Sequence, residues 1–123
     1  MIAIILFFLP AFAFAGTLHP ERAYQEAWCA KVGGVTEHVL SGGSRVDCLT
    51  DEHAIEFDFA SKWQEAIGQS LYYARKTGRA PGIVLIMEAP DDQRYLGRLF
   101  YTIRERGEYI KVWVVRPEDI ATQ

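Results

Sequence analysis

Two acidic residues on neighbouring strands are the part of this chain best suited to metal chemistry. Alternating apolar and polar residues predict a β-hairpin over residues 45–59, with a polar loop in its middle. If Leu49 pairs with Ala54, Asp47 lies directly opposite Glu56. Two carboxylates that face each other across a strand pair repel, and Mg²⁺ typically binds one or two carboxylates while it keeps several waters. The spacing therefore predicts a divalent-cation site between the two strands.

The helix after the hairpin carries three polar side chains on one line. Ser61 is a good N-cap and Gln64 would complete a capping box, so the helix is predicted to begin at Lys62. At about 100° per residue, Lys62, Gln69 and Tyr73 fall on one narrow stripe. The helix begins only a few residues past the second acidic strand, so we expect the lysine and the two carboxylates to converge.

This arrangement resembles the PD-(D/E)XK nuclease superfamily over roughly residues 24–115. Asp47 matches the metal-binding Asp of the second core strand, and Glu56 matches the acidic residue of the (D/E)XK half-motif. The Gln69-xxx-Tyr73 element is similar to that of the RecB-type branch. In the resemblance, Gln69 and Tyr73 orient the catalytic lysine or contact the nucleic-acid backbone.

The resemblance implies hydrolysis of phosphodiester bonds in nucleic acid with Mg²⁺ or Mn²⁺. The two matched acids would hold the ion. The Phe57 carbonyl would be a further ligand, and Glu26, on a leading helix, would be a candidate for an extra carboxylate. Asp58 occupies the usual lysine position, so Lys62 looks like a migrated replacement. It would position the attacking water or stabilise charge that develops on the phosphate.

Three functions remain open, because the superfamily also contains members that no longer cleave. The chain has a net charge of -3 and a pI near 5.6, whereas nucleic-acid binders usually carry a basic excess. The first function is a nuclease; many members of the superfamily act as dimers, so a homodimer is one possible state, which the sequence alone does not decide. The second is an exported nuclease-like module without activity that binds a protein partner in the envelope. The third is a structural envelope protein whose acids are neutralised by Arg45 and Lys62.

The N-terminus reads as an export signal. Residues 1–15 form an unbroken apolar run that ends in Ala13-Phe14-Ala15, an A-x-A cleavage site. The run is short for a membrane span, so cleavage would leave residues 16–123 as one domain without a stable span, periplasmic or secreted. An uncleaved N-terminal anchor is the alternative.

The two cysteines are predicted to form a disulfide, because export leads to an oxidising compartment. Cys29 lies on a predicted helix over residues 21–32, and Cys48 points to the face of its strand opposite Asp47. A bond between them would pin the helix to one side of the sheet and stabilise the fold by roughly 3 kcal/mol. Two buried free thiols are the alternative.

A first strand is predicted over residues 35–40, with a tight turn centred on Gly42-Gly43. This turn would place His38 opposite Asp47, either beside the cation or as an ordinary edge histidine, and would point Glu37 to the solvated face.

The rest of the chain completes an α/β pattern. Residues 83–87 are continuously apolar, as in a strand covered on both faces, and a right-handed crossover would place them parallel to the Glu56 strand. A second amphipathic helix over residues 91–106 and a last strand over residues 109–115 follow. The predicted order is αβββαβαβ, a single-domain mixed sheet flanked by helices. The same order forms the restriction-endonuclease-like core of the PD-(D/E)XK fold.

Overall fold

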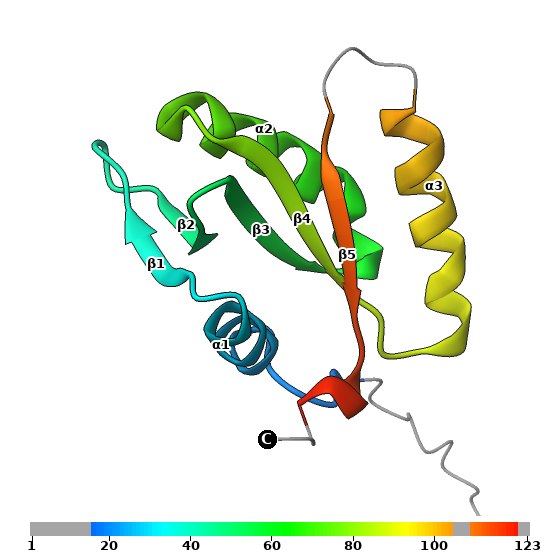
Figure 1. The fold of residues 1–123 in the computed structure, drawn as a ribbon. Coiled ribbons are helices and arrows are strands. Elements are labelled where there is room, and N and C mark those ends of the chain that lie inside the picture. Colours follow the sequence, from blue (N-terminus) through cyan, green and yellow to red (C-terminus); the bar gives the residue numbers. More distant parts are fainter. Residues whose placement is uncertain (1–15, 105–108, 121–123) are drawn as a thin grey trace, which may run out of the picture.

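The computed structural model describes residues 16–104 and 109–120, and the predicted export signal, residues 1–15, lies outside them. Within the described residues the chain forms one five-stranded mixed sheet and three α-helices (Figure 1), which confirms the predicted mixed α/β class. None of these helices has the length and hydropathy needed to cross a membrane. The elements in chain order are α1 (Glu21–Lys31), β1 (Val35–Val39), β2 (Arg45–Leu49), β3 (His53–Phe59), α2 (Trp63–Thr77), β4 (Ala80–Ile86), α3 (Gln93–Ile103) and β5 (Lys111–Val115).

The acidic strand β3 lies at the centre of the sheet. The strand order is β1-β2-β3-β4-β5. The β1–β2 and β2–β3 pairs are antiparallel, whereas the β3–β4 and β4–β5 pairs are parallel. Parallel neighbours need a crossover connection, and α2 and α3 supply the two crossovers. The sheet therefore changes from antiparallel to parallel at β3, the strand that carries Glu56.

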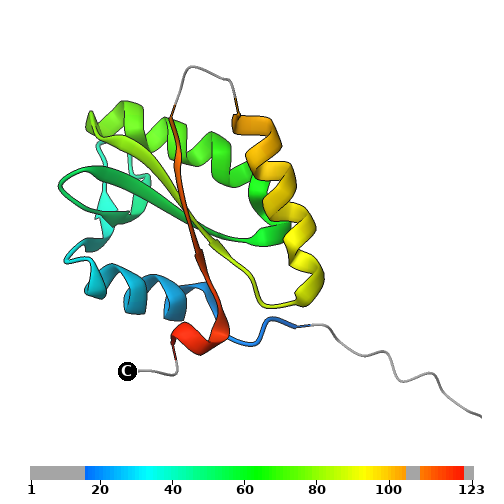
Figure 2. The same cartoon turned by 45° about the vertical axis from the view of Figure 1, so that its right-hand side comes forward.

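Helices cover both faces of the sheet, with α1 on one face and α2 and α3 on the other (Figures 1 and 2). Successive side chains of a strand point to opposite faces, so β4 serves both layers. Val84 and Ile86 belong to the core under α1, and Ile83 and Leu85 belong to the core under α2 and α3. This explains the continuous apolar run that the sequence shows there.

The first hairpin has a longer turn than predicted. The Leu40 N–H donates to the Ser44 carbonyl at 2.7 Å, so the turn contains residues 41–43. Gly42 and Gly43 have φ angles of 100° and 94°, a region that L side chains rarely adopt. The two glycines do form the turn, but the turn has one residue more than the predicted two-residue turn.

This extra residue shifts the register of β1 against β2. His38 pairs with Val46, so the prediction that His38 lies opposite Asp47 is wrong. Glu37 lies across from Asp47 instead. Glu37 is half-buried rather than solvated, and its φ angle is 54°. A slip of one residue moves every side chain of a strand to the other face, which is why both predictions fail together.

A disulfide joins α1 to β2, as predicted. Cys29 and Cys48 are bonded, with their Cα atoms 5.8 Å apart. A Cβ on Gly34 would lie 2.6 Å from the Cys48 sulfur and 2.7 Å from the Cys29 sulfur. Only glycine therefore lets the chain pass the bond as it leaves α1. The bond is compatible with an exported protein.

The central helix α2 begins differently from the prediction. A 3-10 turn, Ala60–Lys62, follows β3 directly, and α2 starts at Trp63. Ser61 lies inside this turn, and no side chain caps the described start of α2, so the predicted cap with Gln64 does not form. The turn brings Lys62 to the N-terminal end of α2, close to the end of β3.

Candidate functional site

Asp47 takes the place of a backbone partner where β2 and β3 separate. Backbone pairing of the two strands covers two residue pairs, one of them the predicted Leu49↔Ala54. Beyond it, the Phe57 N–H donates to Asp47 Oδ2 at 2.8 Å. The N–H and C=O of one strand residue point to the same side, so the Phe57 carbonyl also faces the gap that holds Asp47.

Two buried carboxylates project from one face of β3 beside this gap. Glu56 is 5% exposed and Asp58 is 8% exposed. Among the described atoms, Glu56 Oε2 and Asp58 Oδ2 have no hydrogen-bond partner. Burial and the charges of Asp47 and Asp58 raise the pKa of Glu56 to about 10. Burial and the charges of Glu21 and Glu65 raise the pKa of Asp58 to about 7.

The first turn of α1 adds a further carboxylate, that of Glu21. Its side chain is half-buried, and burial together with the charge of Asp47 raises its pKa to about 7. Burial also raises the pKa of Asp47, against the lowering effect of the hydrogen bond from Phe57. We call the four side chains of Glu21, Asp47, Glu56 and Asp58 the acidic cluster.

Lys62 is the cation at the rim of the acidic cluster. Its charge lowers the pKa values of Glu21 and Asp58, although burial outweighs it in both. The side chain is exposed and forms no ion pair with any residue that the structure describes. Lys62 is therefore close enough to affect the pKa values of Glu21 and Asp58, but it does not pair with either carboxylate.

Tyr73 lies beside the cluster on α2. It is half-buried and packs against the small apolar group of Val46, Leu49 and Ala54. Burial and the charges of Glu56 and Asp47 raise its pKa to about 12. Gln69, one turn earlier on the same helix, is exposed.

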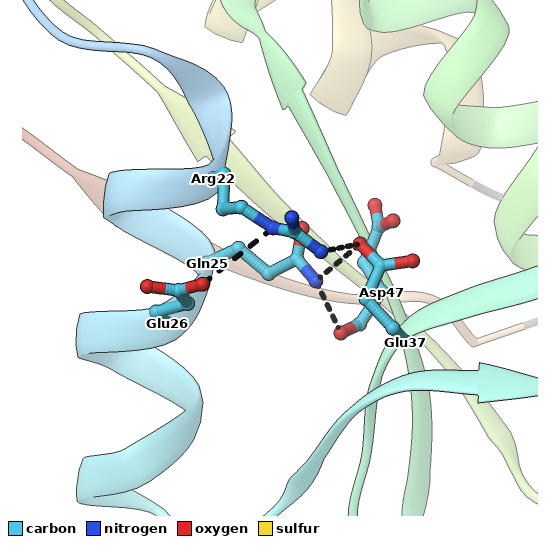
Figure 3. A network of polar contacts seen from close by, with 5 residues as sticks. All are labelled: Arg22, Gln25, Glu26, Glu37 and Asp47. Carbon is cyan, nitrogen blue, oxygen red and sulfur yellow. Dashed lines mark hydrogen bonds and ion pairs between the residues drawn. The ribbon is translucent and has the colours of Figure 1, made fainter.

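A polar network ties α1 to the strand that carries Asp47 (Figure 3). Gln25 Nε2 donates to Glu37 Oε1 at 3.0 Å and to the Asp47 carbonyl at 2.9 Å. Arg22 lies 3.8 Å from Glu37 and 3.5 Å from Glu26. Glu26 points away from Asp47 in this view, so the structure does not bring this candidate ligand into the cluster. Glu21 is the α1 residue that does enter it.

The donor set fits a hydrated divalent cation. Among residues 16–104 and 109–120, no three His, Cys, Asp or Glu side chains are arranged to hold a metal ion. Mg²⁺, however, is usually held through one or two carboxylates and retains several waters. Asp47 and Glu56 supply two carboxylates, and the Phe57 carbonyl would be a third oxygen ligand. Glu56 Oε2 has no competing partner among the described atoms. A site formed entirely by protein ligands does not fit.

Sequence reasoning missed Glu21 as a cluster member. Its place in the first turn of a helix is explained by the helix dipole alone, so its type and position give no separate signal. Asp58 had such a signal, because the period of two along β3 places it on the same face as Glu56.

Comparison of the chain with protein-family models, curated proteins and solved structures finds no match. The acidic cluster therefore has to be interpreted through its own geometry and chemistry.

Proposed function

We propose that this protein is a divalent-cation-dependent nuclease with a PD-(D/E)XK-like core. The observation that carries the proposal is the pair of buried carboxylates beside Asp47, Glu56 and Asp58, each with an oxygen that has no partner among the described atoms. Such groups are costly to bury, and strongly perturbed carboxylates gather at functional sites. The element order and the parallel β3–β4 crossover also support the proposal, because the superfamily core has the same order.

Asp47 and Glu56 would hold the ion, with the Phe57 carbonyl as a third oxygen ligand. The bound ion would polarise a phosphodiester and lower the pKa of a bound water. The hydrogen bond from the Phe57 N–H to Asp47 fixes the direction of that carboxylate before any ion arrives. Lys62 is exposed at the rim, so its ammonium group can reach a phosphate and stabilise the charge that develops on it.

Tyr73 would act as a hydrogen-bond donor in this site. Its pKa is raised to about 12, so the hydroxyl stays protonated at neutral pH and can donate to a phosphate oxygen. Gln69 is exposed one turn closer to Lys62. It would orient the lysine or contact the backbone of the nucleic acid.

A nuclease-like binding module without catalytic activity is the second candidate. The observation that favours it is Asp58, a buried carboxylate where the half-motif has its lysine. This carboxylate adds negative charge next to the position of the scissile phosphate, and the whole chain is also acidic, with a net charge of -3. A protein partner in the envelope would suit such a module.

Metal binding is the first test of the proposal. Calorimetric titration of Mn²⁺ or Mg²⁺ should show binding to the wild-type protein and none to the Asp47→Asn/Glu56→Gln double variant. Glu118→Gln removes an exposed acid outside the cluster and should bind as the wild type does. Equal binding by the double variant would remove these two residues from the metal site.

Cleavage is the second test, with plasmid DNA, single-stranded DNA and RNA as substrates. Lys62→Ala should abolish metal-dependent cleavage while thermal unfolding stays unchanged. Lys31→Ala removes another exposed lysine, whose ammonium group donates a hydrogen bond to the Asp119 carbonyl far from the acidic cluster, and this variant should cleave normally. Full activity of Lys62→Ala would exclude this lysine from the mechanism. Absence of cleavage by the wild type on all three substrates, with a folded metal site, would favour the binding module.

A further inference from the structure

A hollow of about 330 Å³ opens on the α1 side of the sheet, on the face opposite Glu56 and Asp58. It lies between the C-terminal end of α1, the loop that joins β2 to β3, and β5. Its lining residues are Trp28, Val32, Gly33, Thr50, Asp51, Glu52, His53, Ile55 and Trp113. None of them belongs to the acidic cluster, so the hollow is a separate feature of the molecule.

Aromatic rings form one wall of this hollow. The ring centroids of Trp28 and Trp113 are 5.1 Å apart at an angle of 60°, and His53 meets Trp113 edge-on at 5.2 Å. A Cβ on Gly82 would lie 2.9 Å from the Trp113 ring. The absence of a side chain at Gly82 therefore makes room for the indole against β4, and close packing holds the ring in place. The wall is pre-formed, as in most small-ligand sites.

Two carboxylates also line the hollow. Asp51 and Glu52 are exposed on the β2–β3 loop and form no ion pair with any described residue. Two basic side chains of the protein, Lys111 and Arg79, lie near the hollow. Lys111 Nζ lies 5.9 Å from the centroid of the Trp113 ring, and the guanidinium of Arg79 donates to a carbonyl of the same loop. Neither cation lines the hollow.

We propose that this hollow binds the positively charged group of an organic ligand, a guanidinium or an ammonium group. Tryptophan is the aromatic side chain that attracts cations most strongly, and the two loop carboxylates that line the same hollow would pair with the same charge. The group would come from an arginine or lysine side chain of a partner protein or from a small free organic cation. The proposal does not depend on the function of the acidic cluster.

The NMR signals of the tryptophan side chains can be used to detect binding in this hollow. The chain has three tryptophans. Trp28 and Trp113 line the hollow, whereas Trp63 packs in the core on the other face of the sheet. In NMR spectra of the disulfide-bonded protein, N-acetyl-arginine methylamide should shift the indole N–H signals of Trp28 and Trp113 and leave that of Trp63 in place. Choline, tested in parallel, distinguishes a small free cation from a side chain.

Two comparisons make the test decisive. The citrulline counterpart of the arginine probe has nearly the same shape without the charge, and it should cause no shift. The surface double variant Asp51→Asn/Glu52→Gln should weaken binding of the arginine probe roughly tenfold, whereas Glu118→Gln should not. Absence of shifts with both cations would overturn the proposal. Equal shifts with citrulline would also overturn it, and so would a response only to a neutral sugar such as an N-acetylglucosamine oligomer.

Discussion

The two faces of strand β3 are buried to nearly the same extent but hold opposite kinds of side chain. Ile55 and Phe57 are 0% exposed on the face toward α1, while Glu56 and Asp58 are 5% and 8% exposed on the other face. Phe57 contacts Trp28 with ring centroids 5.8 Å apart, in a core that also holds the disulfide. Glu56 and Asp58 each have an oxygen without a partner among the described atoms.

The two faces of β3 make opposite contributions to the free energy of folding. Burial of apolar side chains and the disulfide favour folding on the α1 face. Burial of carboxylates that each have an oxygen without a partner among the described atoms opposes folding on the other face. A strand with both faces dedicated to stability would be apolar throughout, as β4 is from Ile83 to Ile86. The acids of β3 are the side chains that the proposed cation site would use, and each prediction below tests one side of this contrast.

The largest expected effect lies on the apolar face. Phe57→Ala should lower the free energy of unfolding by roughly 3–5 kcal/mol, because the change leaves a cavity in a fully buried core. Urea denaturation of the disulfide-bonded protein measures this loss. Asp58→Asn, a change at the next residue but on the other face, should not destabilise the protein. A loss below about 1 kcal/mol for Phe57→Ala would mean that this face is not the main source of stability.

Much of this contrast could be predicted from residue order alone. The period of two along residues 54–59 separates Phe57 from Glu56, and the turn residues set the Leu49↔Ala54 pair. The same alternation placed Cys48 on the α1 face, so the disulfide followed. Alternation of this kind predicts the orientation of side chains well, because burial of one face of a strand fixes its register.

The features that escaped prediction depend on contacts between distant segments. The charge of Asp47 acts on Glu21 because the disulfide and the Gln25 hydrogen bonds dock α1 beside β2. Trp28 packs against Trp113, although the two residues are far apart in the sequence. The register of the first hairpin depended on a single extra turn residue, which a glycine pair permits but does not specify.

Acidity should stabilise the protein, because the pKa values of Glu21 and Asp58 are raised to about 7. The folded state then binds more protons than the unfolded chain, so stability falls as the pH rises. The contribution is complete below the ordinary pKa values and is lost as the pH passes about 7. In EDTA, Glu21 and Asp58 together should lower the free energy of unfolding from urea titrations by roughly 3 kcal/mol between about pH 5 and about pH 8. Glu56, whose pKa is raised to about 10, should add to this loss.

Two comparisons sharpen this prediction. Asp58→Asn should make the pH dependence shallower, because one of the groups with a raised pKa no longer titrates. Mg²⁺ should also make it shallower, since an ion that binds only the folded state stabilises that state most where the carboxylates are ionised. Stability that rises over the same interval would contradict the raised pKa values and the unpaired state of the cluster.

The smallest effect, and the one of opposite sign to Phe57→Ala, belongs to the neighbouring residue. Glu56→Gln should raise the free energy of unfolding by roughly 1–2 kcal/mol in EDTA near neutral pH. Burial and the neighbouring acids raise the pKa of Glu56 to about 10, so the wild-type chain must take up a proton to fold, whereas a neutral amide of the same shape needs none. Glu118→Gln, exposed and outside the cluster, should change stability by less than about 0.5 kcal/mol. With Mg²⁺ present the advantage of Glu56→Gln should shrink, because only the wild type gains stability from the ion. A loss of stability in EDTA would show that the Glu56 carboxylate holds the sheet together, and the contrast between the two faces of β3 would then not reflect function.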